Sequence, residues 1–192
     1  PHDPSDLRRV LSSNELMESS PRVYDYLDAH RNLLRNRKSY NLKLTDDQPW
    51  GLQSTSSRHL RRGQHLVVVR YMEPHGRPPA AVIPPRVDKR LGITTTAFPN
   101  NKVNFLSCGS VSEADFVAAV VNSKPAQEFI SALVSKTTIA PSVLNALNIP
   151  IFDSENDLHR RLSSLGRDGR LDNENWEDHL TEIDKLVMDL YA

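Results

Sequence analysis

The stretch "KVNFLSCGSVSEADFVAAVVNS" (residues 102–123) changes its hydrophobic period halfway along. Near its start, Val103 and Phe105 alternate with polar neighbours, which is the two-residue period of a half-buried strand. From Ser112 onward the apolar residues follow a helical period, and Ser112 with Asp115 has the spacing of a capping box. A strand followed by a helix is therefore predicted here.

Three more strands are predicted before this stretch, because three short runs rich in β-branched residues end at turn residues. They are "HLVVVRYM" (65–72), "AAVIP" (80–84) and "ITTTAF" (93–98). A helix is predicted to begin at Ser20 as N-cap, with Pro21 in its first position. Its apolar stripe consists of Val23, Leu27, His30 and Leu34. Residues 1–18 show little periodicity and are predicted to be an arm or a packed lead-in.

Helices are predicted to dominate after residue 123. Pro125 starts one helix, and a short helix leads into "NIPIF" (148–152). Ser154 with Asp157 again has capping-box spacing, and the helix that follows has the stripe Leu158, Leu162 and Leu165. "GRDGRLDNEN" (166–175) is predicted to be an exposed polar loop. The last helix has the stripe Trp176, Leu180, Ile183, Val187 and Leu190. The residues expected to pack under the sheet are Leu144, Leu147, Ile149 and Ile151.

These elements predict an α+β fold: a mixed or antiparallel β-sheet body with packed helices and a C-terminal helical hairpin. Two domains are expected, an α/β body with basic loops at residues 1–152 and an acidic hairpin at residues 153–192 packed on it. No run of 18 apolar residues is present, so no membrane partner is expected. The single cysteine, Cys108, excludes an intramolecular disulfide and is typical of a reducing compartment, so a cytoplasmic location is expected.

The formal net charge is zero, but the charges are unevenly distributed. Residues 1–110 hold 17 Lys/Arg and 10 Asp/Glu, whereas residues 111–192 hold 7 and 14. Residues 29–90 are the densest basic segment, with 13 basic and 4 acidic side chains. One basic half indicates either contact with a polyanion or a solvated basic surface, and charge alone leaves both interpretations open.

Patterns for catalysis and metal binding are missing from the sequence. The seven histidines have no metal-ligand spacing, and Cys108 has no base beside it in sequence, so it is expected to be a small core thiol. The chain contains no glycine-rich phosphate loop and no GxSxG motif, and its paired acids are adjacent instead of facing each other across a cleft. No catalytic residue, metal site or cofactor site is therefore predicted within this chain.

Basic and polar side chains of the kinds that contact phosphates and base edges gather between the predicted strands. Aromatic residues make up only 6% of the chain, which favours reading of duplex grooves over stacking on single strands. The candidate DNA contacts are Arg31, Arg35 and Lys38 on one helix face, Arg58, His59, Arg61 and Arg62 in residues 53–64, Arg86, Lys89, Arg90 and Thr95 in residues 86–96, and Asn100, Asn101 and Lys102 in residues 99–102.

Several short motifs follow one another in a specific order. They are His30, Leu34 and Arg37 at the end of a proline-led helix, then Trp50, Val121-Asn122-Ser123, Ile149-Pro150-Ile151, Ile183-Asp184 and Leu190-Tyr191. This order resembles the C-terminal target-recognition region of adenine-specific DNA methyltransferases of restriction–modification and related phage-defence systems. The similarity covers most of residues 19–192.

The resemblance implies a specificity module that recognises double-stranded DNA for a catalytic methyltransferase domain of the same polypeptide. In that family an Asn/Asp-Pro-Pro-Tyr motif holds the flipped adenine, and neither this motif nor an S-adenosylmethionine loop occurs in this chain. The resemblance thus implies that S-adenosylmethionine binds in a missing catalytic half, and that the parent is an N6-adenine methyltransferase or a fused restriction–modification enzyme.

Two other functions stay open on the residues alone. One is a protein-interaction or scaffolding module that uses the apolar strip of the C-terminal hairpin. The other is a small hydrolase or RNA-processing enzyme, for which no catalytic constellation can be assembled. Self-association without DNA binding would favour the interaction module over DNA recognition.

Overall fold

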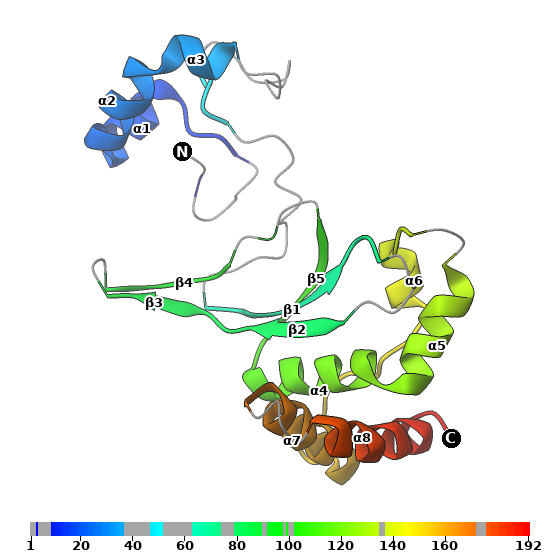
Figure 1. Ribbon diagram of the computed structural model, residues 1–192. Coiled ribbons are helices and arrows are strands. Elements are labelled where there is room, and N and C mark those ends of the chain that lie inside the picture. Colours follow the sequence, from blue (N-terminus) through cyan, green and yellow to red (C-terminus); the bar gives the residue numbers. More distant parts are fainter. Residues whose placement is uncertain are drawn as a thin grey trace. The chain divides into compact units, whose positions relative to one another are not determined.

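The computed structural model describes residues 3, 9–36, 47–51, 63–73, 79–89, 92–97, 99, 102–134, 137–171 and 176–192 (Figure 1). The chain divides into two compact units, Pro1–His59 and Leu60–Ala192. In its described part the first unit is helical, and the second combines two small sheets with helices. The predicted boundary between residues 152 and 153 stays a prediction.

The first unit contains α1 (Ser13–Ser19), α2 (Pro21–Ala29) and α3 (Arg31–Arg35). Residues 1–18 were predicted to be an arm or a packed lead-in, and no helix was named there; the structure has α1, which begins in a capping box between Ser12 and Glu15. Only Leu16 of this seven-residue helix is buried, so the helix has no apolar repeat to detect. Its capping box was the available sequence signal.

The single helix predicted from Ser20 is two helices, because the chain leaves helical geometry at His30 (φ −107°, ψ 14°). Pro21 does occupy the first turn of α2, as predicted. The apolar stripe is not buried: neither α2 nor α3 contains a buried residue, and Val23 is 44% exposed.

The second unit is built on a three-stranded antiparallel sheet in the order β2-β1-β5. Its strands are β1 (His65–Arg70), β2 (Ala80–Ile83) and β5 (Val103–Cys108). A separate two-stranded antiparallel sheet consists of β3 (Arg86–Asp88) and β4 (Ile93–Thr95). The α+β class and the antiparallel body are confirmed. Strand β3 was not predicted.

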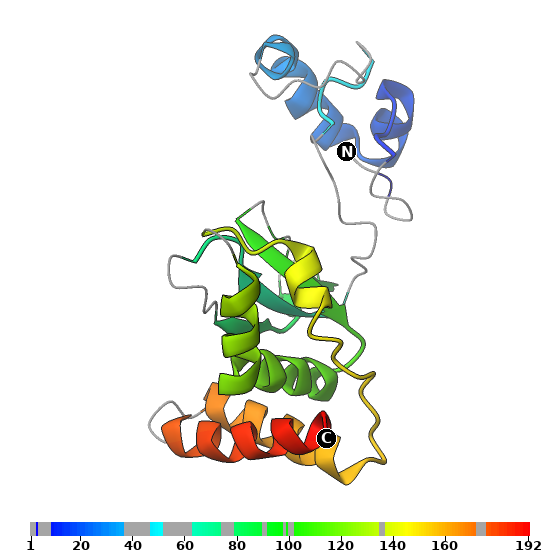
Figure 2. The same cartoon turned by 90° about the vertical axis from the view of Figure 1, so that its right-hand side faces the viewer.

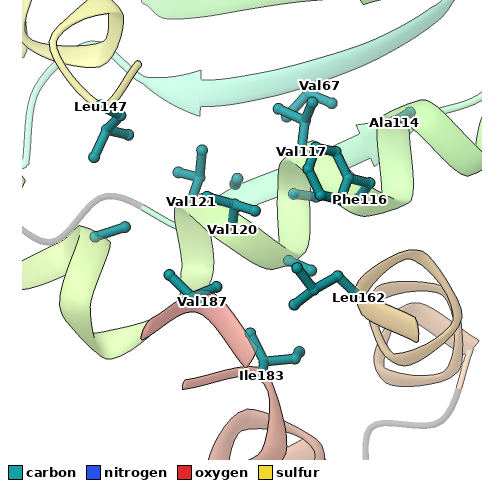
Figure 3. Close-up of a cluster of buried hydrophobic side chains, with 14 of the residues drawn as sticks. Val67, Ala114, Phe116, Val117, Val120, Val121, Leu147, Leu162, Ile183 and Val187 are labelled. Atoms are coloured by element: carbon teal, nitrogen blue, oxygen red, sulfur yellow. The ribbon is translucent and has the colours of Figure 1, made fainter. Parts of the chain in front are cut away.

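The core of the second unit surrounds α4 (Val111–Asn122), whose residues from Ala114 to Val121 are all buried. Because these residues point to all faces of α4, other elements must pack against each of its faces. Figures 1 and 2 show α4 between the sheet and the C-terminal helices α7 (Asp157–Leu171) and α8 (Trp176–Leu190). Figure 3 shows Val67 of β1 on one side of α4, and Leu162 and Ile183 of α7 and α8 on the other.

Both predicted capping boxes of this unit were wrong. Helix α4 is capped by Ser110, whose hydroxyl accepts from the Glu113 backbone N–H. The same Ser-x-x-acid spacing recurs two residues later at Ser112 and Asp115, and the prediction chose this second pair. Asp115, the predicted partner of Ser112, is instead buried at 1% exposure. Helix α7 is capped by Asn156, whose side-chain oxygen accepts from two backbone N–H groups, those of Leu158 and His159.

Helix α7 extends through Leu171, so the predicted polar loop was wrong for residues 166–171. The two glycines that suggested a loop are packing positions. A Cβ on Gly166 would lie 2.3 Å from the Asp115 carbonyl oxygen of α4, and one on Gly169 would lie 2.0 Å from the Trp176 ring of α8. Glycine therefore allows α7 to approach both neighbours closely. The stripes of α7 and α8 are confirmed, with Leu162, Leu165, Ile183 and Val187 buried.

Helices α5 (Lys124–Leu133) and α6 (Pro141–Asn145) complete the described helices of this unit. Leu144 of α6 and Ile149 after it pack against the core as expected, and Leu147 is buried. The expectation for Ile151 was wrong, because this side chain is 91% exposed. Pro150, which cannot donate to a strand ladder, lies outside any strand. None of the described helices is long and apolar enough to cross a membrane.

Side-chain hydrogen bonds also join separate segments of the second unit. The Asn122 amide bonds both backbone groups of Ala80 on the edge strand β2, accepting from its N–H at 2.7 Å and donating to its carbonyl at 3.0 Å. From α8, Asp184 accepts from the Lys124 backbone N–H at the start of α5 (2.7 Å). The Tyr191 hydroxyl donates to the Leu147 carbonyl (2.8 Å), which joins the end of the chain to the segment after α6.

Candidate nucleic-acid interface

In the β3–β4 ribbon, residues 86–88 and 93–95, the side chains of Arg86, Val87, Thr94 and Thr95 are exposed. Pro84 and Pro85 lack backbone N–H groups, so pairing with β1 stops at Ile83 and the chain pairs again as a separate ribbon. Gly92 returns the chain into β4 with a φ of 64°, a conformation that favours glycine. Figure 1 shows the ribbon at the end of the sheet opposite α5 and α6.

The ribbon is held in shape at its base. Arg86 and Thr95 are direct cross-strand partners, and the Thr95 hydroxyl donates to the Arg86 carbonyl at 3.1 Å. One residue further, the Thr96 hydroxyl accepts from the backbone N–H of Gln64 at 3.2 Å, just before β1. These bonds fix the direction in which the ribbon leaves the sheet.

Three predicted DNA contacts lie together on this ribbon or its turn. Arg86, Lys89 and Thr95 are all exposed. Their side chains supply a guanidinium fork, an ammonium group and a hydroxyl, which suit base edges and phosphates. The structure thus brings together part of the predicted set in one narrow element, whose described residues 86–89 and 92–95 carry two basic groups and one acid, Asp88.

Lys102 is exposed but lies elsewhere. It directly precedes Val103, which pairs with Arg70 at the last position of β1, whereas the ribbon follows β2 near the first residues of β1. The six residues of β1 separate these ends by roughly 17 Å. Lys102 therefore does not belong to the ribbon surface.

Arg31 and Arg35 belong to the first unit, and Arg31 has a structural role there. Its guanidinium donates to Asp28 at 2.7 Å and lies 5.3 Å from the Trp50 ring centre. The bond to Asp28 raises the pKa of Arg31 above its ordinary value. Arg31 and Arg35 lie four residues apart on α3, whereas Lys38, the third residue of the predicted basic face, falls outside the described residues.

The other predicted contacts fall outside the described residues. They are Lys38, Arg58, His59, Arg61, Arg62, Arg90, Asn100 and Asn101. Their DNA-binding role stays a prediction from the sequence.

One exposed ribbon residue, Val87, was missed by sequence reasoning. Val87 is 65% exposed and faces Thr94 as its cross-strand partner. An exposed valine beside cationic groups can contact the methyl group of thymine. The alternation of residues 86–88 was too short to signal a strand, so no residue pattern marked Val87 as a surface residue.

The most reactive side chain by type, Cys108, is not available for chemistry. It is fully buried, and burial, followed by the Glu113 charge, raises the pKa of its thiol to about 12. A thiol with this pKa is almost entirely protonated near neutral pH and is a poor nucleophile. Among the described residues, no group of three or more His, Cys, Asp or Glu side chains could hold a metal ion.

The motif positions that carry the resemblance have packing roles where the structure describes them. Trp50 is buried and donates to the Leu11 carbonyl at 3.0 Å. Asn122 pairs with the edge of β2, and Ser123 caps α5. Ile183 is in the core. These residues shape the scaffold and are not part of the exposed ribbon.

No protein-family model matches this chain, and no curated protein matches its sequence.

Proposed function

We propose that this chain is a sequence-specific duplex-DNA recognition module of an N6-adenine DNA methyltransferase, whose catalytic half and S-adenosylmethionine site lie outside residues 1–192. A fused restriction–modification enzyme is one form of such a parent. The observation that carries the proposal is the β3–β4 ribbon, on which Arg86 and Thr95, with Lys89 in the turn, are exposed together. The order of motifs described above supports the class of parent enzyme, and a cytoplasmic location belongs to the same proposal.

The shape of the ribbon suits the proposed target. The major groove of B-DNA is about 12 Å wide and admits a two-stranded β-ribbon. Two paired strands lie about 4.8 Å apart, so a ribbon with its side chains fills that width. In such a complex Arg86 would read a base edge, while Lys89 would contact phosphate.

A separate recognition module is consistent with methylation chemistry. An enzyme that modifies a base must take it out of the helical stack, which requires the flanking duplex to be held in place. A rigid ribbon could hold and read this flanking sequence. The acidic helix α8, with five Asp/Glu and one lysine, would then face away from the DNA.

Titration of duplex DNA at several salt concentrations tests the proposal. Each lost phosphate contact reduces the slope of log affinity against log salt by about 0.9. We expect Lys89→Ala to reduce this slope and Lys185→Ala, which removes an exposed lysine of α8, to leave it unchanged. Binding that does not depend on salt, or equal effects of the two variants, would contradict the proposal.

Base reading is tested separately by selecting bound sequences from a random duplex pool. We expect Arg86→Ala to relax the preference at one position, with a loss of about 1–3 kcal/mol of discrimination. An Arg86→Ala protein that keeps every preference of the parent chain would remove Arg86 from base recognition.

A protein-interaction module is the second candidate, favoured by the apolar side chains exposed at the end of the chain. Met188 and Tyr191 are 62% and 48% exposed. Self-association that rises with concentration and is lost in Met188→Lys, together with no binding to duplex DNA, would favour this function.

A further inference from the structure

A cavity lined by two arginines lies where α7 meets the start of α4. Its volume is about 420 Å³, and its walls include Arg160, Arg167, Ser112, Ser154, Ser164 and Phe152. None of its lining residues belongs to the β3–β4 ribbon of the proposed DNA interface. We refer to it as the Arg160–Arg167 cavity.

The charge of the C-terminal hairpin is divided between its two helices. Helix α7 carries four arginines and two aspartates, whereas α8 carries one lysine and five acids. The hairpin predicted to be acidic is therefore acidic along α8 and basic along α7. The basic helix is the one that lines the cavity.

The two arginines come from the same side of α7. They are seven residues apart, which is about 10.5 Å along the axis and within mutual reach of their long side chains. Hydrogen bonds orient both: Arg160 donates to the Ser154 carbonyl at 3.2 Å, and Arg167 donates to the Ser164 hydroxyl at 3.3 Å.

Each arginine has an acidic partner that a ligand can replace. Arg160 contacts Asp157, whose side chain is 90% exposed, and Arg167 contacts Asp168, which is 42% exposed. Exposed ion pairs of this kind contribute little free energy, because water competes for both charges. A dianion that engages both guanidinium groups would bind them more strongly than these carboxylates do.

The buried carboxylate at the cavity does not repel an anion. Asp115 lies in the wall, but Arg170 donates to its two oxygens at 2.8 and 3.1 Å and neutralises it. The charge that a ligand meets is therefore set by Arg160 and Arg167 together with Asp157 and Asp168, the two exposed carboxylates that it must displace. Serine hydroxyls add neutral hydrogen-bonding groups, and Phe152 adds an apolar wall.

We propose that the Arg160–Arg167 cavity binds a phosphate ester of nucleotide size. Guanidinium groups match phosphate oxygens, and the volume exceeds what phosphate alone needs, leaving space for an attached group beside Phe152. This phosphate can belong to a free nucleotide or to a nucleic-acid backbone. The site does not rest on the proposed ribbon interface.

The test is titration of the full chain with inorganic phosphate and with a nucleoside 5′-monophosphate, followed by calorimetry or by NMR amide shifts. We expect Arg160→Ala and Arg167→Ala each to weaken binding of the monophosphate by about tenfold. Arg161→Ala is the matched control, since Arg161 is the next residue of α7 but pairs with Glu182 of α8 at 2.7 Å and does not line the cavity.

Ser164→Glu is a second variant that does not depend on removing an arginine. Its carboxylate would lie between Arg160 and Arg167 on the same side of α7 and occupy the site from within. We expect this variant to lose monophosphate binding while keeping its unfolding temperature. Retained binding in Ser164→Glu, no binding by the parent chain, or an equal loss in Arg161→Ala would overturn the proposal.

Competition with a short duplex identifies the source of the phosphate. Displacement of the monophosphate by duplex, in a chain that carries Lys89→Ala, would assign the cavity to the DNA backbone. Failure of duplex to displace it would assign the cavity to a free nucleotide. Both results support a phosphate site, and both are independent of the salt dependence measured at the ribbon.

Discussion

At Gly166 the packing of the second unit leaves no room for a side chain. The Gly166 α-carbon faces the Asp115 carbonyl, and an added Cβ would lie 2.3 Å from that oxygen. Backbone on both sides prevents local relief, so α7 would have to move away from α4. The contact explains why a glycine stands in the middle of a fifteen-residue helix.

We expect Gly166→Ala to destabilise the protein by about 2–3 kcal/mol, as overpacking does. Urea unfolding measures the change. Gly109→Ala is the control, because its Cβ would meet only the Glu113 side chain at 3.6 Å. We expect Gly109→Ala to leave stability unchanged or to raise it slightly, because alanine restricts the unfolded chain. The same result in Gly166→Ala would show that α7 and α4 are not in close contact.

Cys108 gives a residue-scale prediction about reactivity. With a pKa of about 12, only about one thiol in ten thousand is ionised at pH 8, and the side chain is also inaccessible. We expect no measurable reaction with a disulfide reagent at pH 8 until the protein is unfolded in guanidinium. Rapid reaction of the native chain would show that the thiol is exposed.

At the scale of the element, the capping box of α1 depends on pH through Glu15. The Arg9 hydrogen bond first, and then those from Ser12, lower the pKa of Glu15 to about 2. A lowered pKa in the folded state means that this carboxylate stabilises the cap above its ordinary value of 4.5, and that the stabilisation is lost as pH falls toward 2.

NMR titration of the Ser12 amide measures this effect, because that N–H donates to the Glu15 carboxylate at 2.9 Å. We expect a midpoint near 2 in the parent chain. In Glu15→Gln the cap should persist, since glutamine also serves in capping boxes, but without this titration. A midpoint at the ordinary value of 4.5 would contradict the Arg9 contact.

The elements that could be predicted from sequence are those with a long or regular apolar repeat. Strands β1 and β5 and the stripes of α7 and α8 were predicted because core burial imposes their period. Helix α1 and strand β3 were missed because each is short and buries little. The end of α7 was missed because glycine signals a loop locally, whereas here it allows close packing.

The candidate site was predictable only in part, for a related reason. Residue type indicated Arg86, Lys89 and Thr95 as contacts. That they lie on one ribbon could be seen only in the structure, because the ribbon forms where Pro84 and Pro85 end the pairing of β2 with β1. Lys102 belonged to the same predicted set, yet the register of β5 places it at the far end of the sheet. Sequence distance could not reveal that separation.

At the scale of the whole molecule, the second unit has a core of its own. Among the described residues, the hydrophobic cluster around α4 is drawn from Val67 to Val187, with partly buried residues as far as Leu190, and includes none from the first unit. A unit with its own core can fold alone. We expect residues 60–192, produced without the first unit, to unfold in one cooperative urea transition.

Coincident midpoints by far-ultraviolet circular dichroism and tryptophan fluorescence would support independent folding, with Trp176 as the single tryptophan of that fragment. A broad transition, or a fragment without near-ultraviolet signal, would instead show that the first unit is needed to stabilise the core.

Asn122 has one further consequence, which concerns association between copies of the chain. An open strand edge is a template on which another chain can add a strand, and proteins protect such edges to prevent aggregation. By bonding both backbone groups of Ala80, the Asn122 side chain occupies the position of an incoming strand. We expect Asn122→Ala, but not Asn145→Ala at an exposed position of α6, to form intermolecular β-structure at high concentration, detectable by light scattering and infrared spectroscopy. The amide that completes the fold of one molecule thereby also keeps its copies apart.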